Sequence, residues 1–183
     1  ILEQDGFTVN PTLWAFYREG AGKDYGQKSA AGSLNNYIFK NEEFAVNEAP
    51  LSAFSAAEWD SVSQYNDAAI MVIGRVCGEG KDLPVVGASD AGGNMLSISA
   101  EEKDILRKLA ELKAAGSLKK IVLLLNTANA VELDVIESAV CGEDFGIDAC
   151  LWVGEVGQSG IRAIGDLLSG KINPSGRLVD TYC

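Results

Sequence analysis

The chain has 183 residues, of which 47% are hydrophobic, so it is long enough for one globular domain with a substantial core. Its formal net charge is −11 and its pI is about 4.4. A surface this acidic repels phosphate backbones and anionic lipid, which argues against nucleic acid and membranes as partners, whereas a neutral, hydroxyl-rich ligand meets no such repulsion.

The sequence contains no histidine, and this absence excludes several kinds of chemistry. Ser-His-Asp and Cys-His catalysis cannot be built from the residues present, and a zinc site is not expected. Proton chemistry near neutral pH would therefore have to use a carboxyl group. We expect neither a metal nor a cofactor.

The cysteines and the ends of the chain suggest the setting of the protein. The four cysteines form no C-x-x-C pair, which favours free thiols in a reducing compartment and leaves a disulfide between Cys141 and Cys150 as an alternative. No apolar run approaches the ~20 residues of a membrane-spanning helix, and the first residues do not resemble a signal peptide. We expect an excised domain of a longer protein, cytoplasmic rather than secreted.

Helix and strand signals alternate along the chain. Asn10 is the expected cap of a helix over residues 11–18 that begins with Pro11. Short, continuously apolar runs predict three strands, over residues 68–73, 121–126 and 149–153. Continuous apolar character is typical of a parallel sheet that is covered on both faces.

Three further helices are predicted between and after the strands. Ser99 and Glu102 form a capping-box pattern ahead of a helix that Gly116 ends, with an inward face of Ile105, Leu106, Leu109 and Leu112. Residues 131–140 predict another helix, with Val131, Val135 and Ile136 inward. Residues 159–168 predict a third, with a buried stripe of Ile161, Ile164, Leu167 and Leu168. The order of elements predicts a single α/β domain over residues 1–183, a mostly parallel sheet between helices (three layers, α/β/α) with right-handed crossovers.

Ligands of open α/β sheets bind beyond the carboxyl ends of the strands. The loop after the first predicted strand places Arg75, Glu79, Lys81 and Asp82 among three glycines. The loop does not fit the phosphate-binding pattern G-x-x-x-x-G-K-[ST], because Arg75 replaces the first glycine and Asp82 the hydroxyl residue. The dinucleotide pattern G-x-G-x-x-G fails as well, at Leu83, which disfavours a Rossmann-like nucleotide domain.

A second glycine-rich turn, residues 154–160, follows the third predicted strand. It is not the G-x-S-x-G elbow of a nucleophilic serine, because Gln158 directly precedes Ser159 and Gly160 directly follows it. We interpret Ser159 as lying near a helix cap rather than as a nucleophile. Trp152, just before this turn, is interpreted as a core residue, with stacking on a sugar as the alternative.

Several segments follow one another in a recognisable order. A strand with a GEG-x-D loop spans residues 67–82, and residues 96–99 follow it. The next strand and turn span residues 121–133, a W…G-Q turn spans residues 152–158, and an N-P-S-G-R-L…T block spans residues 171–181. Together these segments, over about residues 67–182, resemble the second domain of family 3 glycoside hydrolases. This sequence departs from the pattern at Ser159, where many members carry an acidic residue, at Leu83, where many carry arginine, and at Ala130, where proline is common.

The resemblance implies a division of labour between two domains. In this family a barrel domain carries an aspartate nucleophile and the second domain lends the general acid/base, in a retaining mechanism with the two carboxyls ~5–5.5 Å apart. The resemblance implies that Glu79 is the catalytic acid/base and that Lys81, Asp82 and Arg75 bind the substrate. It also implies two partners, a carbohydrate substrate and the N-terminal barrel of the same parent chain. Alternatively, Glu79 is a solvated loop residue and Lys81 and Asp82 form a surface ion pair.

Two functions from different classes therefore stay open. One is a β-glucosidase-like glycosidase domain that is inactive on its own because its nucleophile lies elsewhere. The other is a non-catalytic α/β module that binds a small ligand or a protein partner.

Overall fold

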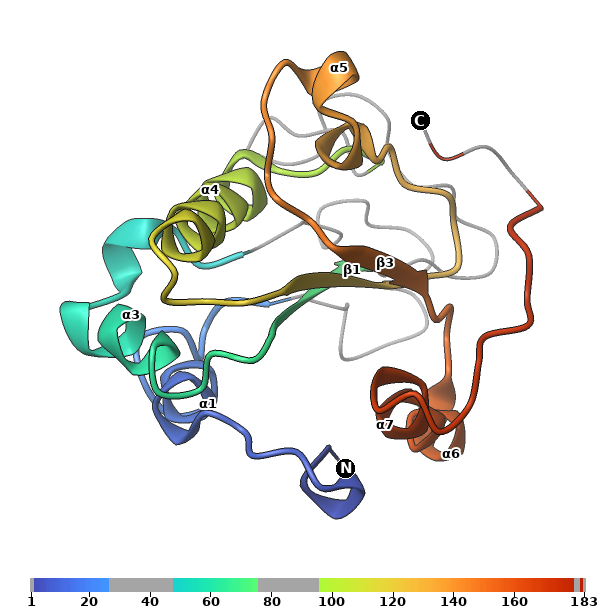
Figure 1. Ribbon diagram of the computed structural model, residues 1–183, viewed down its shortest axis with the longest axis horizontal. Coiled ribbons are helices and arrows are strands. Elements are labelled where there is room, and N and C mark those ends of the chain that lie inside the picture. The colour runs from blue at the N-terminus through green and yellow to red at the C-terminus, as the bar shows by residue number, and fades with distance from the viewer. Residues whose placement is uncertain (1, 27–47, 76–95, 180–181, 183) are drawn as a thin grey trace, which may run out of the picture.

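The computed structural model describes residues 2–26, 48–75, 96–179 and 182 (Figure 1). Its centre is a parallel sheet of β1 (Ala69–Arg75), β2 (Ile121–Thr127) and β3 (Ala149–Trp152), in the order β1-β2-β3. Ala69 lies opposite Ile121, and Leu125 lies opposite Trp152. All three predicted strands are confirmed within two residues at each end.

Helices lie on both sides of this sheet, which confirms the predicted α/β fold. In Figure 1, α4 and α5 lie on one side and α6 and α7 on the other, while α1 and α3 pack together beside them. Short 3-10 turns join these elements. The helices and turns are η1 (Leu2–Asp5), α1 (Pro11–Arg18), η3 (Leu51–Ala53), α3 (Ala56–Val62), α4 (Ala100–Ala114), η4 (Asp134–Ile136), α5 (Ser138–Cys141), α6 (Gly157–Gly160) and α7 (Ala163–Leu168).

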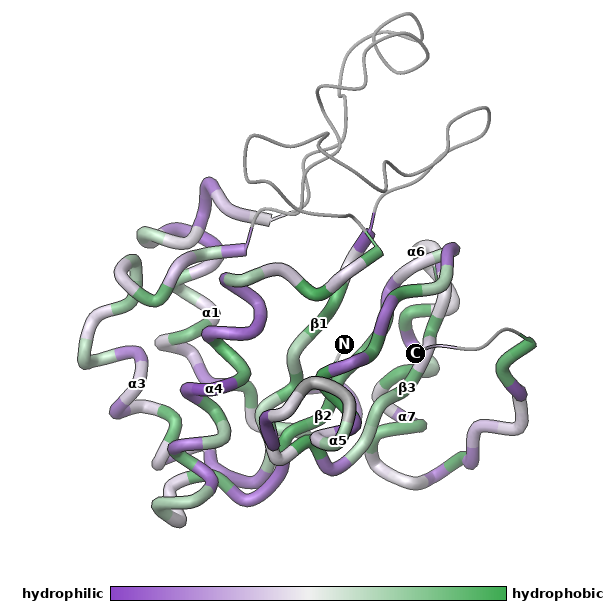
Figure 2. The backbone as a smooth tube through the Cα atoms, turned by 90° about the horizontal axis from the view of Figure 1, so that it is seen from above, coloured by the Kyte–Doolittle hydropathy of each residue, from purple (hydrophilic) through white to green (hydrophobic). Residues whose placement is uncertain are grey.

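The main core lies between α4 and one face of the sheet. Alternate residues of β1 and β2 point to this face and meet the predicted inward face of α4; the buried members include Met71, Ile73, Ile105, Leu106, Leu109, Ile121, Leu123 and Leu125. Figure 2 shows the resulting contrast between largely apolar strands and helices of mixed polarity. The opposite face of the sheet is less completely covered, as the 52% exposure of Val72 shows.

Local signals placed α1 and α4 correctly. Asn10 accepts hydrogen bonds from the backbone N–H groups of Thr12 and Leu13, and Pro11 opens α1 as predicted. The capping box of Ser99 and Glu102 is formed. Gly116, just after the C-cap, has a φ of +76°, a conformation that favours glycine, and α4 ends there.

The helix predicted over residues 131–140 is wrong. Glu137 is extended, with φ −111° and ψ 100°, and separates η4 from α5. Val131, Leu133 and Val135 are all buried, which is the alternation of an extended chain rather than of a helix. Val131 and Val135 do point inward, but Ile136 is 41% exposed.

The helix predicted over residues 159–168 is broken into α6 and α7. Its apolar stripe is not a core face: Ile161 is 37% exposed, and Gly165 is the residue of α7 that is buried. The reason is that α7 packs on η1 through Gly165. Because Gly165 has no Cβ, the carboxylate of Asp5 occupies the space that a side chain would fill. The helix α3 is not among the predicted elements, although Ser55 and Glu58 form a second capping box.

Candidate functional site at the carboxyl edge of the sheet

The parallel strands bring their carboxyl ends to one edge of the sheet. Arg75 ends β1 and lies opposite Thr127, the last residue of β2, while Trp152 ends β3 opposite Leu125, two positions earlier in β2. Both glycine-rich segments of the sequence leave the sheet at this edge. Of the predicted site residues, Arg75 is described, whereas Glu79, Lys81 and Asp82 lie outside the described residues.

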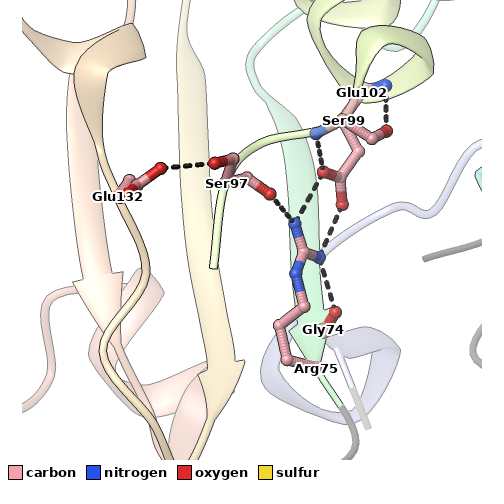
Figure 3. A network of polar contacts seen from close by, with 6 residues as sticks. All are labelled: Gly74, Arg75, Ser97, Ser99, Glu102 and Glu132. Carbon is pink, nitrogen blue, oxygen red and sulfur yellow. Dashed lines mark hydrogen bonds and ion pairs between the residues drawn. The ribbon is translucent and has the colours of Figure 1, made fainter. Parts of the chain in front are cut away.

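Arg75 is buried and makes an ion pair with Glu102 of α4 (Figure 3). Its Nη1 donates to Glu102 Oε1 at 2.9 Å, and its Nη2 donates to Oε2 at 2.8 Å, so the contact is bidentate. The two side chains are 0% and 4% exposed. The same guanidinium donates to the carbonyl oxygens of Gly74 and Ser97, each at 2.7 Å.

Glu102 joins this pair to the start of α4. Its Oε2 accepts the backbone N–H of Ser99 at 2.7 Å, and its own N–H donates to Ser99 Oγ at 3.1 Å. The capping box and the ion pair therefore share one carboxylate. The sequence predicts only the capping role of Glu102, because no local pattern relates it to an arginine 27 positions earlier.

Glu132, in the segment after β2, makes further contacts with the residues that lead into α4. Its backbone N–H donates to the carbonyl of Leu96 at 2.7 Å, and its carboxylate accepts a hydrogen bond from Ser97 Oγ (Figure 3). Residues 96–99 are thus held by the end of β1, the first turn of α4 and the segment after β2. We call Arg75, Ser97, Ser99, Glu102 and Glu132 the Arg75 network.

Glu48 is a second carboxylate that sequence analysis missed. It is half-buried, and one of its oxygens accepts both the hydroxyl of Tyr17 at 3.0 Å and the N–H of Ala49 at 2.7 Å. Burial raises the pKa of the Glu48 carboxyl, its two hydrogen bonds oppose that rise, and the charge of Glu102 adds to it. Glu48 therefore lies within electrostatic reach of the Arg75 network, in a stretch for which the sequence predicted no element.

The edge beside β3 agrees only in part with its sequence-based interpretation. Trp152 is 42% exposed rather than a core residue, and its indole N–H donates to the carbonyl of Thr127 at 2.7 Å. Ser159 lies in the short helix α6, three residues after the N-cap residue Val156, which agrees with its predicted position near a helix cap. Glu155, in the same turn, is exposed.

The opposite, amino edge of the sheet carries a separate polar cluster around Asp148. Its carboxylate accepts Lys113 Nζ at 2.6 Å, Lys120 Nζ at 2.8 Å and the backbone N–H of Ile121 at 2.9 Å. These donors hold the pKa of Asp148 well below its usual range, with the Lys113 hydrogen bond the largest cause. This cluster ties α4 to the starts of β2 and β3, far along the strands from the Arg75 network.

Cys150, in β3, is a free thiol, so the alternative disulfide with Cys141 is not formed. Burial raises the pKa of its thiol to about 11, which makes it a poor nucleophile at neutral pH. Among the described residues, no helix is long and apolar enough to cross a membrane.

The fold and its polar carboxyl edge define an α/β domain of the kind that binds ligands beyond its strands. Residues 11–183 match the glycosyl hydrolase family 3 C-terminal domain, and the chain belongs to that family.

Individual relatives agree with this assignment. The chain is 32% identical to a beta-glucosidase of Ruminococcus albus over 65% of its own length and 11% of the relative's. It is 38% identical to an exo-1,4-beta-xylosidase of Aspergillus niger over 43% of its length and 9% of the relative's. The crystal structure of a beta-glucosidase from Paenibacillus barengoltzii superposes with a TM-score of 0.67 and 25% identity, covering 95% of this chain and 16% of the other. The chain thus spans less than a fifth of these proteins.

Proposed function

We propose that this chain is the second domain of a retaining family 3 glycoside hydrolase and that Glu79 is its general acid/base. The observation that carries the proposal is the family match over residues 11–183. It is supported by the position of Glu79, four residues beyond the end of β1 in the sequence, since β1 ends at the edge where α/β sheets bind ligands. The names of the relatives favour β-linked glucosides or xylosides as the substrate class.

In the proposed reaction the two domains divide the work. A carboxylate of an N-terminal barrel domain attacks the anomeric carbon, and the glycosidic bond breaks as Glu79 donates its proton to the leaving oxygen. Glu79, now ionised, then takes a proton from water as that water displaces the enzyme carboxylate and releases the sugar. Lys81 and Asp82 would bind sugar hydroxyls. The predicted binding role of Arg75 stays a prediction, and its burial against Glu102 favours an indirect role.

The test of Glu79 needs the full-length enzyme with its barrel domain. Glu79→Ala should cripple hydrolysis of a disaccharide, whose leaving group needs protonation, by about 10²–10⁴-fold. Activated aryl glycosides should lose less at the first step, and added azide should restore turnover, because azide attacks the glycosyl-enzyme without a general base. Glu155→Ala is the matched comparison. If Glu155→Ala shows this pattern and Glu79→Ala does not, Glu155 is the acid/base and the proposal for Glu79 is refuted.

The alternative of a non-catalytic module is tested on the chain alone and on the native gene product. The isolated chain should release no p-nitrophenol from aryl glucosides, xylosides or N-acetylglucosaminides, because it supplies one carboxyl partner and no nucleophile. Robust turnover by the chain would contradict the split site. A native protein without a barrel-sized N-terminal region would favour the non-catalytic module instead.

A further inference from the structure

The Arg75 network lies at both ends of the segment that carries Glu79. Arg75 directly precedes residues 76–95, and Ser97 lies just after them. The hydrogen bond from Arg75 Nη2 to the Ser97 carbonyl, at 2.7 Å, joins the two ends to each other. The ion pair with Glu102 then fixes both ends to α4, and Glu132 fixes Leu96 and Ser97 to the segment after β2.

Stability alone does not explain why a buried ion pair occupies this position. A buried ion pair repays the loss of hydration only with near-ideal geometry, and apolar residues of similar volume commonly give equal or greater stability. What a bidentate arginine–carboxylate pair adds is direction, because the planar guanidinium and the carboxylate fix each other's orientation. At this place a fixed direction matters, since a general acid misplaced by about 1 Å loses on the order of 10²-fold in rate.

We propose that Arg75, Glu102 and Glu132 are positioning residues for the general acid/base, which set where the segment bearing Glu79 leaves the sheet and where it returns. The inference rests on the proposed function of Glu79. It assigns the side chain of Arg75 to the protein scaffold, because a guanidinium that is 0% exposed and donates to Glu102, Gly74 and Ser97 is already committed to protein acceptors.

The main test uses the double variant Arg75→Met/Glu102→Gln in the full-length enzyme. Glutamine still serves as the third residue of a capping box, and methionine keeps the apolar stem of arginine, so the fold is retained without the charge pair. The expected result is a fall of about 10- to 100-fold in kcat for the best disaccharide substrate, with a much smaller change in KM. The kcat/KM of the activated 2,4-dinitrophenyl glycoside, which reports the first step, should fall less than that of the disaccharide, as for Glu79→Ala. The single variant Arg75→Lys should have a kcat between those of the wild type and the double variant, because an ammonium group keeps the charge but cannot make the bidentate contact.

Two further variants separate positioning from a general loss of structure. In the Glu79→Ala background the Arg75→Met/Glu102→Gln pair should cause no additional loss, since the group it positions is gone. The control is Asp148→Asn, which weakens the polar cluster at the opposite edge of the sheet and should lower thermal stability while leaving kcat unchanged well below the melting temperature.

The outcomes distinguish this inference from the proposed function. If Glu79→Ala leaves disaccharide hydrolysis unchanged, the proposed function and this inference both fail. If Glu79→Ala is crippled but the folded double variant keeps the wild-type kcat, only the positioning role is overturned. The positioning role is also overturned if the double variant loses rate equally on both substrates and adds to the loss of Glu79→Ala, because that is the behaviour of a non-specific structural defect.

Discussion

Replacing Arg75 by methionine in the 183-residue chain leaves the Glu102 carboxylate buried without its cation. Both side chains are almost fully excluded from solvent, and their contacts of 2.8 and 2.9 Å are close to ideal. Removing one partner of such a pair costs about 3–5 kcal/mol of unfolding free energy. This loss is a large part of the about 5–15 kcal/mol by which domains of this size are stable. Since each kcal/mol lowers the melting temperature of such a domain by about 2–4 °C, the melting temperature should fall by roughly 6–20 °C.

The double variant Arg75→Met/Glu102→Gln should be more stable than Arg75→Met alone. Removing the second charge ends the burial of an unpaired carboxylate, and glutamine keeps the cap on the Ser99 N–H; we expect a recovery of about 2 kcal/mol. The residual loss reflects the Gly74 and Ser97 carbonyls, which lose their donor. Urea unfolding of the wild type, both single variants and the double variant at pH 7 measures the coupling. A loss below about 1 kcal/mol for Arg75→Met, or a double variant no more stable than Arg75→Met, would refute the reasoning.

Three other predictions concern single groups. Asp148→Asn should lower the unfolding free energy by about 1–2 kcal/mol at pH 7. Because the folded pKa of Asp148 is depressed, the stability that its carboxylate contributes is present above the usual carboxyl pKa and is lost as the pH falls below it. Urea unfolding at pH 3 should therefore show a smaller difference in unfolding free energy between the variant and the wild type. Glu48→Gln should raise stability at pH 7, because the folded pKa of Glu48 is raised and the charged form opposes folding at neutral pH; unfolding curves at pH 4 should converge, and a gap that widens there would contradict this. The Cys150 thiol, with a pKa of about 11, should react with iodoacetamide at pH 8 only after unfolding, as peptide mapping can show; fast labelling of the folded chain would contradict its burial.

The sequence predicted those elements whose signals are local. The strands are short apolar runs, and their continuous character indicated a parallel sheet with helices on both sides. The caps of α1 and α4 involve residues two to four positions apart, which is the range over which spacing is informative. The failures occurred where two periodicities compete: Val131, Leu133 and Val135 alternate like an extended chain, yet Val131 and Val135 are also spaced like one face of a helix.

The candidate site was predictable only in part, because its described contacts join residues far apart in the sequence. Position at the end of the first strand identified Arg75 as a polar residue at the ligand-binding edge. That its partners are Glu102 and Ser97 depends on how α4 packs across the sheet, and no local pattern encodes this. Glu48 likewise acquires its perturbed pKa from burial, from Tyr17 and Ala49, and from the distant Glu102. Glu79, Lys81 and Asp82 remain predictions from the motif.

The hydrogen bond between Arg75 and the Ser97 carbonyl turns the intervening chain into a closed ring whose junction belongs to the scaffold. In general, doubling the number of residues between two fixed chain ends adds only about 0.6 kcal/mol of closure entropy. The packing of α4 on the sheet should therefore depend little on how many residues lie between Arg75 and Ser97, whereas the proposed catalytic position of Glu79 should depend on that number strongly. The junction thus separates two requirements, since the core needs only the two ends to be joined, while the proposed chemistry needs the chain between them to keep one length.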